Sequence, residues 1–162
     1  MSVDSQYPLR YDLGGLEFYL QDTVLYTLSK SRQLKPGSKE QFGILIGTKS
    51  AFRDAYWVES VTTPARVDHS SRSSYFMQSP HHQERLDSLF LKSNGEQIYL
   101  GTWHTHPESW PIPSYVDKRD WRQCQNRNRG RQLFFILVGT EGIMVFVRRQ
   151  LSYEPMTIVD QP

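Results

Sequence analysis

The apolar positions of the chain form short runs and periodic stretches that predict interspersed strands and helices. Runs at residues 16–20, 42–46 and 56–61 have the length and composition of strands, and the second is dense enough in apolar residues to be buried. Between the first two runs, leucine and valine recur every three or four positions, which predicts a helix over about residues 21–32. Residues 65–74 are polar and predict a loop.

The second half of the chain continues this pattern. A helix is expected to begin at Ser79-Pro80, because serine is a good N-cap and proline suits the first turn, and to end near Asn94-Gly95. The other expected elements are a strand at 98–105, a proline-rich loop at 107–113, a helix over about 114–125, and two strands at 133–138 and 143–147 that form a hairpin.

This order of elements predicts a single-domain α/β (α+β) fold with a mixed β-sheet flanked by about three helices. The 162 residues are enough for one compact domain with a core, so we expect residues 1–162 to form one domain. The longest apolar run, 133–138, is far shorter than the roughly 20 residues that a membrane-spanning helix needs, so no membrane partner is expected.

Charge and cysteine content narrow the class of protein. The formal net charge is only +2, which does not argue for nucleic acid as a partner. The single cysteine, Cys124, cannot form an intramolecular disulfide and fits a reducing compartment. The first eleven residues lack the apolar stretch of a secretory signal, so we expect a cytoplasmic location.

Two histidines at the end of a predicted strand are candidate metal ligands. Side chains alternate along a strand, so His104 and His106 are expected to project from the same face, where two imidazoles can bind one metal ion. Pro107 cannot extend a central ladder of hydrogen bonds, which places the histidines at the end of the strand.

A third ligand is expected from the next helix. Ser114 is a good N-cap, which makes Asp117 the third residue of that helix, on one face with Trp121 and Cys124. These apolar neighbours indicate that the face points inward, so the carboxylate needs a cation or a capping role. Together with the two histidines, it would complete the ligand set of a hydrolytic zinc site.

Glu40 and Ser114 are candidate catalytic groups. Glu40 directly precedes the buried strand at 42–46, where a carboxylate can act as a general base. Ser114 offers a hydroxyl that can stabilise an oxyanion. From the residues alone, a solvated turn next to Lys39 and Gln41 is the favoured interpretation of Glu40, and Ser114 also fits a plain N-cap.

The order and spacing of these residues resemble the JAMM motif of the MPN (JAB1/MPN/Mov34) metallopeptidases. The motif positions are Glu40, His104-Thr105-His106-Pro107, Ser114 and Asp117. Seven residues separate His106 from Ser114 and two separate Ser114 from Asp117, so no motif position is missing. Gly43, Gly47 and the order of elements extend the resemblance over most of the chain.

The resemblance implies an MPN/JAB fold, whose mixed sheet with helices at its sides is similar to the cytidine-deaminase-like layer. It also implies hydrolysis of peptide or isopeptide bonds at the C-terminus of ubiquitin-like modifiers. By the same resemblance, His104, His106 and Asp117 bind one Zn²⁺ ion per chain, Glu40 is the general base, and Ser114 stabilises the oxyanion.

A narrower resemblance concerns the bacterial JAMM peptidases of CBASS anti-phage operons. It is carried by Trp103 before the histidines and by Trp121 and Cys124 after the aspartate. Those peptidases release a cyclic-nucleotide synthase (a CD-NTase) conjugated to targets through its C-terminus, which implies a protein substrate with a flexible C-terminal tail. The alternatives are C-terminal processing of a small ubiquitin-like or sulfur-carrier protein and a non-catalytic MPN scaffold. The complete ligand set argues against the scaffold.

Two further features are a predicted groove and a basic stretch. Residues 65–76 and 107–113 are expected to form walls of a groove for a peptide tail, with Trp110 and Tyr115 in its lining. A basic stretch fits either a solvated helix end or a docking surface for an acidic partner. Its cations are Lys118, Arg119, Arg122, Arg127, Arg129 and Arg131.

The remaining histidines and the cysteine are expected to have no catalytic role. His69, His81 and His82 are expected at the surface. His81 and His82 are neighbours on a predicted helix, where side chains point about 100° apart, so this pair is expected to chelate poorly. Cys124 has no evident base within sequence reach and is expected to be a small buried hydrophobe rather than a nucleophile.

Overall fold

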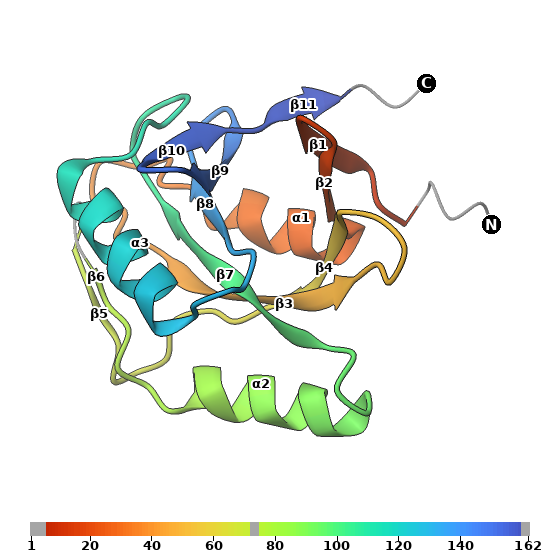
Figure 1. Cartoon of the computed structure of the whole chain (residues 1–162). Coiled ribbons are helices and arrows are strands. Elements are labelled where there is room, and N and C mark those ends of the chain that lie inside the picture. Colours follow the sequence, from red (N-terminus) through yellow and green to blue (C-terminus); the bar gives the residue numbers. More distant parts are fainter. Residues whose placement is uncertain (1–5, 72–74, 160–162) are drawn as a thin grey trace.

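A nine-stranded mixed sheet forms the centre of the molecule (Figure 1). The computed structural model describes residues 6–71 and 75–159, and its large sheet has the strand order β10-β9-β8-β7-β3-β4-β2-β1-β11. The strands are β1 (Leu9–Leu13), β2 (Leu16–Leu20), β3 (Phe42–Lys49), β4 (Ala55–Val61), β7 (Ile98–Thr105), β8 (Phe134–Val138), β9 (Ile143–Arg149), β10 (Ser152–Pro155) and β11 (Thr157–Val159). A separate two-stranded sheet pairs β5 (His69–Ser70) with β6 (Tyr75–Phe76).

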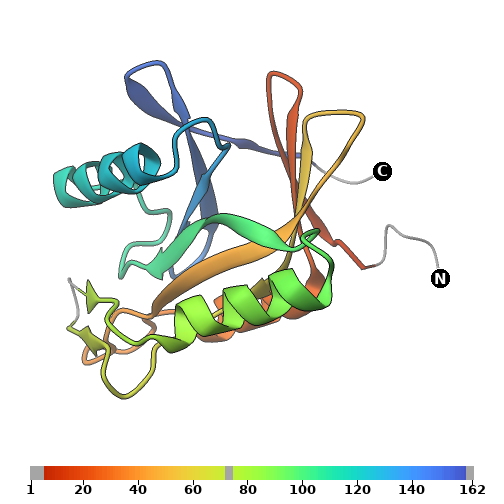
Figure 2. The same ribbon diagram turned by 60° about the horizontal axis from the view of Figure 1, so that its bottom comes forward.

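Three helices connect and cover these strands in the described part of the chain. They are α1 (Asp22–Lys30), α2 (His81–Lys92) and α3 (Tyr115–Arg127). The helix α3 joins β7 to β8, which run parallel, and parallel neighbours need such a crossover connection. Figure 2 shows α3 separated by the sheet from α1 and α2. The predicted mixed sheet with three flanking helices is therefore confirmed.

The alternation of side chains along β8 explains why helices lie on both faces of the sheet. All five residues of β8 are buried. Phe134, Ile136 and Val138 belong to the core that includes the buried side of α1, whereas Phe135 and Leu137 pack in a second cluster with α3. A central strand that is buried on both faces reads as a continuous apolar run, as this one does.

Element boundaries follow the sequence expectations closely, with one correction at a helix start. The N-cap residue of α2 is Pro80 and makes no side-chain capping bond, so the prediction that Ser79 caps this helix is wrong. The Ser79 hydroxyl instead contacts the Nδ1 atom of His81 at 2.7 Å. Ser114 does cap α3, and β8 and β9 form the expected antiparallel hairpin.

The strands that sequence reasoning missed lie at or next to the edges of the large sheet and in the loop before α2. The strand β1 forms a hairpin with β2 through Gly14 and Gly15, both with positive φ, and β10 and β11 are short and largely exposed. His69–Ser70 forms β5, so the loop expected over 65–74 is partly wrong; residues 72–74 lie outside the described part. Within that described part, no helix is long and apolar enough to cross a membrane.

The contact of β3 with the end of β4 leaves no room for a side chain at Gly43. A Cβ atom there would lie 1.8 Å from the backbone oxygen of Thr62, so Gly43→Ala must displace backbone. We expect it to lower the free energy of unfolding by about 1–3 kcal/mol, or roughly 2–10 °C in Tm, in thermal melts. Gly37→Ala, at a position with open space, is the matched control and should melt like the parent.

Candidate metal centre

The C-terminal end of β7 brings two imidazoles together inside the protein. His104 pairs with Phe42 of β3 and Leu137 of β8, and the backbone N–H of His106 donates to the carbonyl of Val138 at 2.9 Å. Both side chains point to the same side, with Nε2 atoms 3.0 Å apart. Only 1% of His104 and 8% of His106 is exposed, so the pair is held in a shielded place.

Asp117 reaches the same point from the first turn of α3. Its Oδ1 atom lies 3.0 Å from His104 Nε2, and its Oδ2 atom lies 3.2 Å from His106 Nε2. The carboxylate also accepts a hydrogen bond from the backbone N–H of Ser114, whose hydroxyl accepts from the N–H of Asp117 in return. This capping box fixes the start of α3 and the third donor group in one arrangement.

These three groups form a donor set that suits a metal ion. Their ligand atoms lie within 4.8 Å of one another, and all three residues are buried. Two imidazoles and one carboxylate match the ligands of catalytic zinc sites. Three buried polar groups that converge in this way could share one cation as a common partner.

The pKa values of the group show a carboxylate that stays ionised. Burial alone would raise the pKa of Asp117, but hydrogen bonds with His104 and His106 outweigh it and hold the pKa well below its usual range. Burial lowers the pKa of His104 despite the nearby Asp117. For His106 burial also acts to lower the pKa, but Asp117, Glu108 and Glu40 together raise it.

Glu40 lies two positions before the first residue of β3 and is buried, with 5% of its surface exposed, so its interpretation as a solvated turn residue is wrong. Burial raises the pKa of Glu40 to about 7; the charge on His106 acts to lower it, and the charge on Asp117 raises it further. A carboxyl group with a pKa near neutrality can both accept and donate a proton at physiological pH.

A polar network that the sequence did not predict attaches the segment before β3 to the end of β7, which carries the two histidines. Thr105, between the two histidines, donates its backbone N–H to the Gln41 carbonyl at 2.9 Å. The Thr105 hydroxyl accepts from the Gln41 N–H and donates to the side chain of Gln33, each at 2.9 Å. The only sequence signal for this network was a threonine within the motif; Gln33, 2% exposed, gave none.

The expectations for the other histidines and for the cysteine are confirmed in part. His69 is exposed as expected, but His82 is only 4% exposed and its ring centroid lies 3.9 Å from that of His81. The prediction that His82 is a surface residue is therefore wrong. Cys124 is 7% exposed, contacts the hydroxyl of Tyr99 at 3.0 Å and has a thiol pKa raised by burial, as expected of a small buried hydrophobe.

The surroundings of the centre carry large exposed apolar side chains. Trp110 is 53% exposed, Ile112 72% and Tyr115 80%, and all three lie on the loop and helix start between His106 and Asp117. The other expected wall, 65–76, falls partly outside the described residues. The cations of the basic stretch are exposed, which fits both interpretations offered for it.

Comparison with known proteins gives the family. The model of the prokaryotic homologs of the JAB domain matches residues 28–152, a span that contains all the motif positions. The chain belongs to the prokaryotic JAB family. This assignment agrees with the resemblance to the JAMM motif and with the fold.

Two curated relatives of this JAB domain carry the name CD-NTase/cGAS isopeptidase. The protein from Vibrio cholerae is 34% identical over 72% of this chain and 72% of its own length. The protein from Escherichia coli is 34% identical over 63% of this chain. The match spans 64% of the Escherichia coli protein, which is less than two thirds of that relative.

Among solved structures, protein DSY2949 from Desulfitobacterium hafniense is similar with a TM-score of 0.58. The identity is 23%, and the match covers 85% of this chain and 88% of the other. At that identity the likeness concerns the fold alone.

The raised pKa of Glu40 predicts a pH-dependent stability effect in the metal-free protein. Below the ordinary pKa of 4.5, Glu40 is protonated in both the folded and the unfolded protein, so it does not change the free energy of unfolding. As the pH rises from 4.5 to about 7, the carboxyl group ionises more readily in the unfolded chain, which destabilises the fold progressively. We expect Glu40→Gln to raise the free energy of unfolding by up to about 3 kcal/mol at about pH 8 and far less at about pH 5. Urea unfolding in chelator measures this, with the exposed Glu154→Gln as control. Equal stability of Glu40→Gln and the parent at pH 8 would contradict the raised pKa.

Proposed function

We propose that this chain is a zinc-dependent JAMM-type isopeptidase, with residues 1–162 as one catalytic domain. The observation that carries the proposal is a buried His104–His106–Asp117 donor set beside a buried carboxyl group, Glu40, whose pKa is raised to about 7. A general base and a metal-binding donor set in one shielded place are the requirements of metal-assisted hydrolysis.

The two imidazoles and the Asp117 carboxylate would hold one Zn²⁺ ion. When bound, the ion supplies a Lewis acid that polarises a carbonyl and lowers the pKa of water. The capping bonds of Ser114 keep the Asp117 carboxylate oriented towards the imidazoles, and such supporting bonds preserve ligand geometry.

Glu40 would move the proton. Hydrolysis forms a bond between the water oxygen and the scissile carbonyl carbon and breaks the carbon–nitrogen bond. Glu40 accepts a proton from the water and delivers it to the leaving amine, so that the products are a carboxylic acid and an amine. A pKa near 7 suits both halves of this transfer.

Ser114 would stabilise the developing oxyanion. Its hydroxyl oxygen already accepts a hydrogen bond from the backbone of Asp117 at 3.1 Å, which leaves the hydroxyl proton to be donated elsewhere. The residue is exposed at the start of α3, where a substrate can reach it. Donors to an oxyanion typically contribute about 2.7–4 kcal/mol to the transition state.

The name of two relatives supports the substrate class. We propose that the substrate is a CD-NTase joined to a target through its C-terminus, as part of CBASS defence in the cytoplasm, and that the bond after this C-terminus is hydrolysed. A small ubiquitin-like or sulfur-carrier precursor remains the alternative substrate. A scaffold function is disfavoured because the donor set and the base are both present.

Metal content and cleavage together test the proposal. We expect the parent protein and Glu40→Gln each to bind about one zinc ion, and only the parent to cleave a CD-NTase–target conjugate, with a loss in rate of at least about 100-fold for the variant. Elemental analysis and a gel-based cleavage assay measure the two quantities, and Glu154→Gln is the control that should cleave normally.

Three outcomes count against parts of the proposal. A parent protein without divalent metal under zinc-replete conditions removes the metal centre. Metal without cleavage of either a CD-NTase conjugate or a ubiquitin-like precursor indicates a binding module. Cleavage of the precursor alone selects the alternative substrate.

Trp110 is expected to contact the substrate tail. The residue is 53% exposed while one edge of its ring packs over Gly142, so the loop between His106 and Asp117 presents a supported aromatic surface. We expect Trp110→Ala to raise KM for a tail substrate about 10-fold and to change kcat less than about twofold. Steady-state kinetics measure both constants. Phe52→Ala, at a fully exposed aromatic away from the motif, should change neither; an unchanged KM for Trp110→Ala contradicts the contact.

A further inference from the structure

A polar segment that leads from β4 into β5 passes beside Glu40. We call residues 63–71 the β5 arm. Its last residue, Ser71, accepts a hydrogen bond from the backbone N–H of Glu40 at 2.6 Å. None of the side chains of the β5 arm belongs to the buried core, so polar contacts must hold the arm in place.

Asp68 supplies several such contacts among the described residues of the arm. Its side chain is fully shielded from solvent. One carboxylate oxygen accepts from the backbone N–H groups of Gln78 and Ser79 at 2.6 and 2.7 Å, and the other accepts from the N–H of Ala65 at 2.8 Å. The carboxylate therefore ties the β5 arm to the residues that lead into α2. Burial alone would raise the pKa of Asp68, but these bonds and one from His82 hold it below its usual range.

His82 connects this carboxylate to the central sheet. Its Nε2 atom lies 2.9 Å from Asp68 Oδ2, and its Nδ1 atom contacts the hydroxyl of Thr62. The same hydroxyl accepts from the backbone N–H of Ile44 in β3 at 2.9 Å. The carbonyl of Thr62 accepts from the indole N–H of Trp103, the residue before the first candidate ligand, at 2.9 Å.

One assignment of protons satisfies every member of this chain of contacts. The N–H of Ile44 donates to the Thr62 hydroxyl, the hydroxyl donates to Nδ1 of a neutral His82, and Nε2–H of His82 donates to Asp68. Burial lowers the pKa of His82 although Asp68 acts to raise it, which agrees with a neutral ring. Fully satisfied buried networks of this kind favour one rigid geometry.

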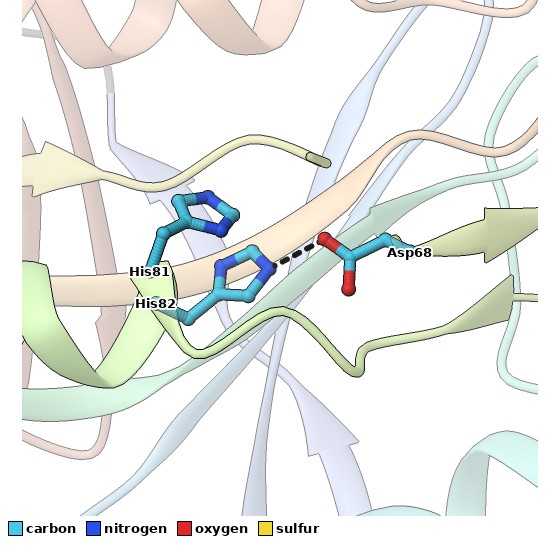
Figure 3. A group of neighbouring side chains, drawn as sticks. All are labelled: Asp68, His81 and His82. Atoms are coloured by element: carbon cyan, nitrogen blue, oxygen red, sulfur yellow. Dashed lines mark hydrogen bonds and ion pairs between the residues drawn. The ribbon is translucent and has the colours of Figure 1, made fainter. Parts of the chain in front are cut away.

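The nearness of Asp68, His81 and His82 also raises the question of a second metal site (Figure 3). In Figure 3 the dashed contact joins His82 to Asp68, while His81 is not joined to either. The Nδ1 atom of His81 contacts the Ser79 hydroxyl at 2.7 Å, and its Nε2 atom contacts the Thr63 carbonyl at 2.8 Å. All four ring nitrogens are thus engaged by protein groups, which favours a structural network over a metal site.

We propose that Asp68 and His82 are positioning residues that hold the β5 arm against Glu40 and so fix the place of the base. The inference rests on the proposed isopeptidase function. Glu40 would be attached on two sides: its own N–H to the β5 arm, and the backbone of Gln41 to Thr105. In this proposal, Asp68 and His82 act through Glu40 and do not contact the substrate.

We call the contact between Asp68 and His82 the anchor of the β5 arm. Its removal should loosen the arm and slow the chemical step. In Asp68→Asn and His82→Phe of the full chain, we expect amide hydrogen exchange of residues 63–71 to accelerate roughly 10- to 100-fold. We expect kcat for conjugate cleavage to fall by a similar factor, since small displacements of reacting groups are costly, while KM changes less than about threefold. This pattern is the reverse of that expected for a groove residue.

Two further variants separate anchoring from simple loss of structure and from metal binding. His82→Gln keeps a donor towards Asp68 and should recover part of the kcat that His82→Phe loses; it also serves if Asp68→Asn does not fold. His81→Ala should change kcat less than about threefold, and zinc content should stay at about one per chain in every variant. Loss of a second zinc ion in Asp68→Asn, His82→Phe and His81→Ala would overturn the anchor in favour of a metal site.

The exchange and kinetic results decide the remaining cases. Parent-like exchange in both Asp68→Asn and His82→Phe overturns the anchor, and so does faster exchange with unchanged kcat. Failure of the parent protein itself to cleave counts against the proposed function alone, and the exchange rates then decide whether the arm is anchored as described.

Discussion

The arrangement of the centre depends on Asp117, which is bonded at once to a helix start and to two imidazoles. Its carboxylate accepts from the backbone of Ser114 in the capping box and contacts the Nε2 atoms of His104 and His106. The orientation of α3 is therefore coupled to the end of β7. The inward face of α3, with Trp121 against Phe135, holds the helix on the sheet and keeps that coupling in register. The cap of α3, the packing of α3 on the sheet and the geometry of the donor set therefore depend on one another.

Burial gives the two carboxylates of the centre opposite properties. Asp117 has partners for its charge, so its pKa is held low, whereas Glu40 has few, so its pKa is raised to about 7. Two acidic groups in neighbouring buried positions are pushed apart in pKa in this way when their hydrogen bonds differ. The same desolvation that destabilises ionised Glu40 makes it a proton acceptor suited to neutral pH. A cation among these groups would offset the buried negative charge.

Local patterns in the sequence predicted the parts of the centre that depend on local geometry. Alternation along a strand placed His104 and His106 on one face, and the N-cap at Ser114 placed Asp117 in the first turn of its helix. The burial of Glu40 and His82 could not be read in this way, because it comes from contacts distant in sequence. Thr105 and Gln33 are separated by 72 positions, and Thr62 and His82 by 20. Periodicity carries no information about such pairs.

Polar contacts hold the proposed base because its own segment contributes no buried apolar side chain. Between residues 31 and 41 the buried side chains are Gln33 and Glu40, and the one large apolar side chain, Leu34, is 68% exposed. Hydrophobic packing is not directional and would tolerate small shifts of such a segment. Hydrogen bonds from Gln41 to Thr105 and from Glu40 to the β5 arm fix its position more narrowly. Hydrogen bonds of this kind hold the segment without buried apolar side chains. They would fix the distance between the proposed base and the candidate metal-binding group, and catalysis by positioned groups is sensitive to such distances.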